Sequence, residues 1–155
     1  MLNGLKGVFA CLNSHDVRYV VIGGVAAIAH GANRLTHDLD ILIDATPENA
    51  ERLLAALEQA GFGTASLISP PELLDTEITI FNDRDRIDVQ TRTPGIEFDA
   101  AWSRRETADF YDQTFFVLSK EDLIASKRAA GRDVDLEDIR ALQPDDRDPA
   151  DNFPD

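Results

Sequence analysis

The order of two short motifs constrains the fold of this chain more than any other feature. Residues 17–22 form an apolar run, typical of a buried strand, that ends at Gly23-Gly24. A short helix is expected next, over residues 25–30, and a second strand over residues 38–44 begins with Asp38-Leu39-Asp40. Residues two apart on a strand face the same side, with their Cα atoms roughly 6.6 Å apart. The pattern therefore predicts two neighbouring carboxylates beside a glycine turn.

This arrangement favours a site for a divalent cation and a phosphate. Close carboxylates repel each other when both are ionised, and the repulsion raises one pKa unless a cation neutralises them. Mg²⁺ takes oxygen ligands and leaves positions open for phosphate oxygens. The backbone at Gly23 and Gly24 permits close approach of a phosphate at the start of a helix. Either motif alone is more often a solvated strand face or a plain turn, and it is their order that points to a nucleotide.

The rest of the chain mixes helices and strands without an internal repeat. Thr46-Pro47 and the pair Ser119 and Asp122 are typical of helix starts. A mixed β-sheet flanked by helices is expected, an α+β or mixed-sheet α/β fold in a single domain over residues 1–143. The expected helices cover residues 2–12, 47–60, 98–102, 120–130 and 134–142, and the expected strands cover residues 77–81, 86–91 and 114–118, with a hairpin turn at 82–85.

Charge and composition exclude several classes of partner. The chain has 15 Lys and Arg against 29 Asp and Glu, a net charge of −14, which argues against broad DNA binding and against an anionic membrane surface. No apolar run reaches the roughly 20 residues of a membrane helix. With Cys11 as the single cysteine, a cytoplasmic protein is expected. Residues 144–155 carry five aspartates and one arginine, and are expected to be a disordered acidic tail.

Gly23-Gly24 followed by Arg34-x-Thr36-x-Asp38-Leu39-Asp40 resembles the core signature of the polymerase-β-like nucleotidyltransferase superfamily. The likeness is greatest to small bacterial members, which include the nucleotidyltransferase-type toxins of toxin–antitoxin systems. That family adds a third carboxylate between apolar residues, and Ile87-Asp88-Val89 matches it. Many members have Gly-Ser where this chain has Gly23-Gly24, so a hydroxyl contact to phosphate is missing here.

The resemblance extends to the C-terminal part of the chain. In toxin-like members a lysine and an aspartate from a helical segment approach the nucleotide. The residues that match this segment are Lys127, Gly131, Arg132, Asp135 and Asp138. Lys127 would neutralise phosphate charge, or would be an ordinary solvent-facing lysine. Asp135 and Asp138 lie three apart on the expected helix, and either positions Lys127 or lies on the surface.

The resemblance implies a metal-dependent nucleotidyltransferase that moves a nucleoside monophosphate from a nucleoside triphosphate to an acceptor hydroxyl. Mg²⁺ or Mn²⁺ is expected on Asp38, Asp40 and Asp88, and these three residues and Lys127 are the expected catalytic set. The residues expected to bind the nucleotide are Gly23, Gly24, Arg34, Thr36 and Asp138.

The acceptor stays open among an RNA end, a protein and a small molecule, and the acidity of the chain weakens the case for RNA. The toxin-like resemblance implies an antitoxin protein as a partner. A hypothesis of a different class is a non-catalytic nucleotide-binding or regulatory module that retains the nucleotidyltransferase fold.

Overall fold

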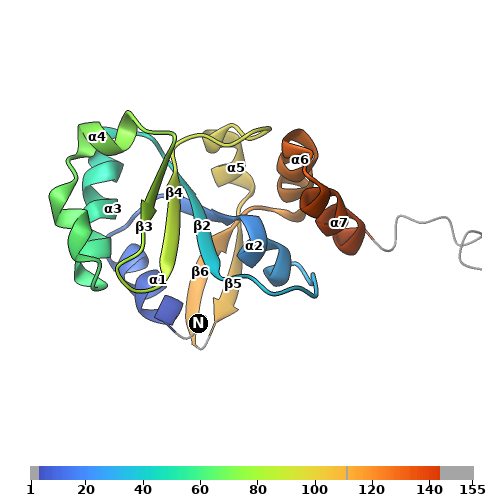
Figure 1. The fold of residues 1–155 in the computed structure, drawn as a ribbon, viewed down its shortest axis with the longest axis horizontal. Helices are drawn as coiled ribbons and strands as arrows, with labels where there is room; N and C mark the ends of the chain where they lie inside the picture. The colour runs from blue at the N-terminus through green and yellow to red at the C-terminus, as the bar shows by residue number, and fades with distance from the viewer. Residues whose placement is uncertain (1–3, 111, 144–155) are drawn as a thin grey trace, which may run out of the picture.

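The computed structural model describes residues 4–110 and 112–143 (Figure 1). In this part of the chain a mixed sheet of six strands has the order β3-β4-β2-β1-β6-β5. β1 is antiparallel to β2 and parallel to β6, β2 is parallel to β4, and the pairs β3–β4 and β5–β6 are antiparallel. The strands are β1 (Tyr19–Ile22), β2 (Asp38–Ile43), β3 (Ile78–Phe81), β4 (Arg86–Gln90), β5 (Glu106–Phe110) and β6 (Gln113–Val117).

Helices surround this sheet, which confirms the expected mixed α/β architecture in one domain. In Figure 1, α3 and α4 lie together at the left of the view, and α6 and α7 pair at the right. The acidic tail expected over residues 144–155 lies outside the described residues. The helices are α1 (Leu5–Ser14), α2 (Gly23–Ala29), α3 (Pro47–Gln59), α4 (Pro70–Leu74), α5 (Phe98–Arg104), α6 (Lys120–Ala130) and α7 (Asp133–Leu142), with a 3₁₀ turn, η2 (Gly63–Leu67), between α3 and α4.

Side-chain caps fix where two of the helices begin. The hydroxyl of Thr46 accepts a hydrogen bond from the Asn49 N–H at 3.2 Å, and Pro47 is the first helical residue of α3. The hydroxyl of Ser119 accepts from the Asp122 N–H at 3.1 Å and starts α6. α6 ends at Gly131, whose φ of +68° is left-handed and favours glycine. Both predicted helix starts are thus confirmed.

The two faces of β2 separate the core from the site. Leu39, Ile41 and Ile43 are buried at 1% exposure or less, as their alternation predicts. Asp38 and Asp40 point to the opposite face and are only partly buried. One face of the sheet is therefore covered by the core, while the other presents carboxylates.

Some boundaries and elements differ from the expectations. The first strand begins at Tyr19 instead of Val17, and α2 begins at Gly23 instead of Val25, so the glycines form the first turn of the helix. β5, α4 and η2 were not predicted: β5 is an edge strand, and the two others are single short turns without a hydrophobic period. None of the described helices is long and apolar enough to span a membrane.

Candidate active site

Two adjacent parallel strands bring three carboxylates to one place. β2 and β4 pair in the register Asp38 with Arg86 and Asp40 with Asp88, so the side chains of Asp40 and Asp88 are lateral neighbours on one face. Asp38, Asp40 and Asp88 line a single cavity of about 320 Å³ between this face and α6. Two other cavities are each lined by a single carboxylate and hold no such group.

Asp40 is the carboxylate of this group whose pKa is strongly shifted. Burial, followed by the charges of Asp88 and Asp38 and a hydrogen bond with Asp88, raises the pKa of Asp40 to about 7. The Arg86 guanidinium acts in the opposite direction but does not offset these effects. The site thus holds more negative charge than its own residues neutralise.

Arg86 is the cation of this cluster, and the motif analysis missed it. Its Nε donates to Asp88 Oδ1 at 2.9 Å, its Nη2 donates to Asp88 Oδ2 at 3.2 Å, and its Nε lies 3.8 Å from Asp38 Oδ2. The signal was present in the sequence, because residues 86 and 88 are two apart on a strand and share a face. The hydrogen bonds with Asp88 and the neighbouring carboxylate charges raise the pKa of Arg86.

The two glycines are required by close approach of neighbouring side chains. Gly23 has a φ of +68°, and a Cβ at this position would overlap the Oδ2 atom of Asp40. A Cβ at Gly24 would lie 2.8 Å from Thr36 Oγ1. Gly23 lines the cavity, whereas Gly24 is buried beneath Thr36. The hydroxyl of Thr36 itself donates to the Asp38 carbonyl at 3.3 Å.

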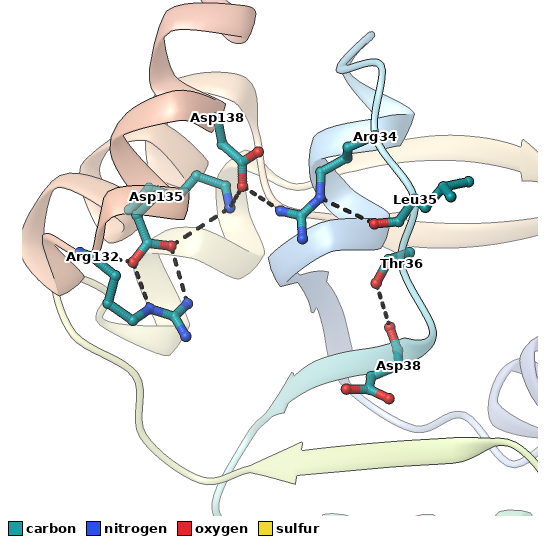
Figure 2. Close-up of polar contacts among 8 residues, drawn as sticks. Arg34, Leu35, Thr36, Asp38, Arg132, Asp135 and Asp138 are labelled. Atoms are coloured by element: carbon teal, nitrogen blue, oxygen red, sulfur yellow. Dashed lines mark hydrogen bonds and ion pairs between the residues drawn. The ribbon is translucent and has the colours of Figure 1, made fainter.

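A second set of charges connects α6 and α7 to the loop before β2, as Figure 2 shows. The Oδ2 atom of Asp138 accepts from Lys127 Nζ at 2.7 Å and from Arg34 Nη1 at 2.6 Å. Arg132 donates two hydrogen bonds to Asp135, at 2.7 and 3.1 Å, and Lys127 Nζ lies 4.0 Å from the same carboxylate. We refer to these five residues as the helical ion network.

Burial of this network decides between the alternatives for its members. Lys127 is 5% exposed, Asp135 2% and Asp138 5%, so none of the three is a solvent-facing side chain. Both aspartates hold Lys127, whose amine lines the cavity. Although burial raises the pKa of Asp135, the hydrogen bonds and charge of Arg132 outweigh it and lower that pKa overall.

The structure divides the predicted site residues into two groups. The cavity is lined by Gly23, Asp38, Asp40, Asp88 and Lys127, together with Arg86, Arg132 and Asp135. Gly24, Arg34, Thr36 and Asp138 lie behind this lining and hold parts of it in place. Local spacing could not predict the second group, because Arg34 and Asp138 are 104 positions apart in the sequence.

The donor chemistry of the cavity fits a hard divalent cation. Three carboxylates supply only oxygen ligands, and burial together with the charges of Asp88 and Asp38 raises the pKa of Asp40 among them. In the described residues no three His, Cys, Asp or Glu side chains already surround one point as metal ligands. At this cluster Arg86 binds both oxygens of Asp88, so these oxygens are not free to bind a cation. A cation here requires that side chain to move.

Solved structures with the same fold have been described as nucleotidyltransferases. A "putative nucleotidyltransferase" from Thermotoga maritima matches with a TM-score of 0.59 and 19% identity over 94% of this chain and 93% of that one. An "antigenic nucleotidyltransferase-like protein" from Paracoccidioides brasiliensis matches with a TM-score of 0.59 and 16% identity over 90% of this chain and 73% of that one. At these identities the likeness establishes a shared fold.

A comparison with curated proteins finds no match. One family model, described as a nucleotidyltransferase of unknown function (DUF6036), matches residues 5–143 and so includes every residue of the cavity. The resemblance drawn from the glycine and aspartate motifs is thereby confirmed at the level of the family. The chain belongs to the DUF6036 family of nucleotidyltransferases of unknown function.

Proposed function

We propose that this protein is a metal-dependent nucleotidyltransferase that moves a nucleoside monophosphate from a nucleoside triphosphate to an acceptor hydroxyl. The observation that carries the proposal is the convergence of Asp38, Asp40 and Asp88 on one cavity, beside Gly23 and Lys127. Membership of a nucleotidyltransferase family supports the same reaction class.

Asp38, Asp40 and Asp88 would hold Mg²⁺ or Mn²⁺ through their carboxylate oxygens. The bound cations would supply charge stabilisation for the attacking and leaving oxygens of the transferred phosphoryl group. Asp88 lies on β4, between Asp40 and the edge strand β3, and its carboxylate would help to take the proton of the acceptor hydroxyl. The acceptor oxygen would bond to the α-phosphorus, the bond to the bridging oxygen would break, and pyrophosphate would leave.

The cations of the cavity bear on the nature of the acceptor. Of the described residues that line it, Arg86, Lys127 and Arg132 are the cationic ones, and each is bound to an aspartate. RNA binding draws on basic side chains free to contact successive phosphates. A hydroxyl of a protein or a small molecule therefore suits this cavity better than an RNA end. Through the toxin-like resemblance, the proposal extends to a toxin role with an antitoxin partner.

Label transfer tests the reaction directly. The protein is incubated with each α-labelled nucleoside triphosphate, Mg²⁺ or Mn²⁺, and total RNA or total protein. We expect label on a macromolecule or a small-molecule fraction, and its loss in the double variant Asp38→Asn/Asp40→Asn. Asp44→Asn is the matched control, because Asp44 follows the same strand but pairs with Arg18 at 3.3 Å and does not line the cavity.

Two results would contradict the proposal. Transfer that persists in the double variant would show that the carboxylates of Asp38 and Asp40 are not required for the reaction. Tight binding of a triphosphate without transfer to any acceptor would instead support a non-catalytic nucleotide-binding module.

A further inference from the structure

Arg86 spans the carboxylate cluster as a cation would. Its Nε lies 2.9 Å from Asp88 Oδ1 and 3.8 Å from Asp38 Oδ2, and its Nη2 lies 3.2 Å from Asp88 Oδ2. These contacts join the two outer carboxylates of the cluster, on neighbouring strands. The guanidinium thus contacts two of the three proposed metal ligands at once.

The two partners differ in their freedom to move. The side chain of Arg86 is 42% exposed, whereas that of Asp88 is 13% exposed and sits between the buried Ile87 and Val89. A rotation of Arg86 away from Asp88 moves its charged end toward solvent without uncovering core residues. Asp88 has no comparable freedom, so Arg86 is the partner that can leave.

Charge balance makes this departure costly unless another cation arrives. Without the guanidinium, Asp38, Asp40 and Asp88 would face one another with no counter-ion within the cluster. The nearest further cations that line the cavity, Lys127 and Arg132, are held by the aspartates of the helical ion network. Arg86 and a divalent cation would therefore each supply positive charge to the same three carboxylates.

We propose that Arg86 is the resident counter-ion of the carboxylate cluster and that it exchanges with a divalent cation on Asp88 and Asp38. This inference rests on the proposed function, since it takes the three carboxylates as the cation site. Arg86 is a positioning residue in this account: it holds the carboxylates together while no cation is bound, and it competes with the cation for them.

The test is direct Mn²⁺ binding, measured by titration calorimetry on the full chain. Arg86→Gln removes the competitor, and we expect it to lower the Kd for Mn²⁺ by about two- to fivefold, the range for a partly exposed ion pair. Arg104→Gln is the matched control. Arg104 makes the same two-bond contact with Asp122, at 2.9 and 3.0 Å, outside the cavity, so its loss should leave the Kd unchanged.

Thermal melts provide a second readout. Without metal, Arg86→Gln should melt at a lower temperature than the wild type, because the carboxylates lose their counter-ion. Saturating Mn²⁺ should remove this difference. Arg104→Gln should show the same deficit with and without Mn²⁺.

Arg86→Lys separates exchange from simple charge repulsion. Lysine keeps the positive charge but cannot donate the paired hydrogen bonds of the guanidinium, so its Kd should fall between those of the wild type and Arg86→Gln. A Kd for Arg86→Lys equal to that of the wild type, with tighter binding only in Arg86→Gln, would overturn the exchange.

Failure of this inference differs from failure of the proposed function. If the wild type binds Mn²⁺, Asp88→Asn loses it, and Arg86→Gln binds no tighter than the wild type, the exchange is refuted while the cation site stands. If neither the wild type nor Arg86→Gln binds Mn²⁺, the proposed metal site itself is refuted.

Discussion

Two groups of charged side chains contribute to the same cavity, and they differ in their balance of positive and negative charge. The carboxylate cluster on β2 and β4 has three aspartates and one guanidinium, a formal charge of −2. The helical ion network on α6, α7 and the loop before β2 has two aspartates and three cations, a formal charge of +1. The pKa of Asp40 is raised in the first group, and that of Asp135 is lowered in the second.

This difference in charge balance distinguishes the carboxylate cluster, which is suited to binding a cation, from the helical ion network, which has a structural role. In the network every carboxylate has cations within hydrogen-bond distance, so removing one partner would leave another charge buried and unpaired. In the cluster a single guanidinium faces three carboxylates and does not offset the effects that raise the pKa of Asp40. Substitutions that remove one carboxylate should therefore act with opposite sign in the two groups.

The largest effect is expected at Asp138, in the network. Asp138→Asn leaves the buried amine of Lys127 with Asp135 at 4.0 Å, and it leaves Arg34 without its carboxylate. Loss of one partner of a buried ion pair costs about 3 kcal/mol of unfolding free energy. Urea denaturation measures this loss. Glu137→Gln, an exposed change on the same helix, should cost almost nothing, and equal stability of the two variants would break the comparison.

At Asp40, in the carboxylate cluster, removal of the carboxylate is expected to stabilise the metal-free protein instead of destabilising it. Its folded-state pKa of about 7 lies above the ordinary aspartate value of 3.8, so the folded protein binds more protons than the unfolded chain between these pH values. The contribution of Asp40 to stability therefore falls as the pH rises from about 4 to about 7 in the metal-free protein. Asp40→Asn should remove this slope and stabilise the metal-free protein at pH 8 by on the order of 2 kcal/mol.

Thermal or urea unfolding across this pH range, in the presence of a chelator, checks the prediction. Asp44→Asn should retain the wild-type slope, because Asp44 lies outside the cavity. Destabilisation by Asp40→Asn at pH 8 would show that the cluster is balanced without a metal.

A smaller loss of stability is expected at Gly23, whose backbone lies against the Asp40 side chain. Gly23→Ala places a Cβ against the Asp40 carboxylate at a left-handed φ, and should cost about 1–2 kcal/mol. Gly7→Ala is the control, since Gly7 lies in α1 and a Cβ there meets nothing within 4 Å. In thermal melts, Gly7→Ala should be neutral or stabilising. A similar result for Gly23→Ala would show that the Asp40 side chain moves to accommodate the added Cβ at little cost.

The smallest effect is expected at the exposed end of the network. The side chain of Arg132 is 73% exposed, so Arg132→Gln should cost less than about 1 kcal/mol near neutral pH. Because Arg132 lowers the pKa of Asp135 below the ordinary aspartate value of 3.8, the pair stabilises the fold above this pH. The stabilisation is lost as the pH falls through the lowered pKa of Asp135. Urea denaturation at two pH values tests this sign, and a deficit that grows in acid would contradict it.

Local patterns predicted much of this architecture. The alternation of β2, the caps at Thr46 and Ser119, and the apolar neighbours of Asp88 each depend on residues a few positions apart. These local signals predicted Asp38 and Asp40 on one face of the strand, whereas Asp88 was added as the third carboxylate by the family resemblance. β5 was not predicted because its sequence, Glu-Thr-Ala-Asp-Phe, contains no apolar run.

The partners of these charges could not be predicted in the same way. Arg34 meets Asp138 only because the loop before β2 and α7 are brought together by the fold. The burial of Lys127 likewise depends on the packing of α6 against α7. The side chain of Arg86 could have been assigned to the cluster by strand alternation, but a sequence does not show that it binds Asp88 in preference to solvent.

The most direct test of the central claim is a crystal grown with Mn²⁺ and a non-hydrolysable nucleoside triphosphate analogue, with anomalous scattering recorded for manganese. We expect an anomalous peak bound by Asp38, Asp40 and Asp88, at about 2.1 Å from their oxygens as for a small hard cation. The triphosphate should lie beside Gly23, and the side chain of Arg86 should no longer contact Asp88. A triphosphate bound elsewhere, or a cavity in which Arg86 still holds Asp88 and no manganese is present at saturating Mn²⁺, would contradict it.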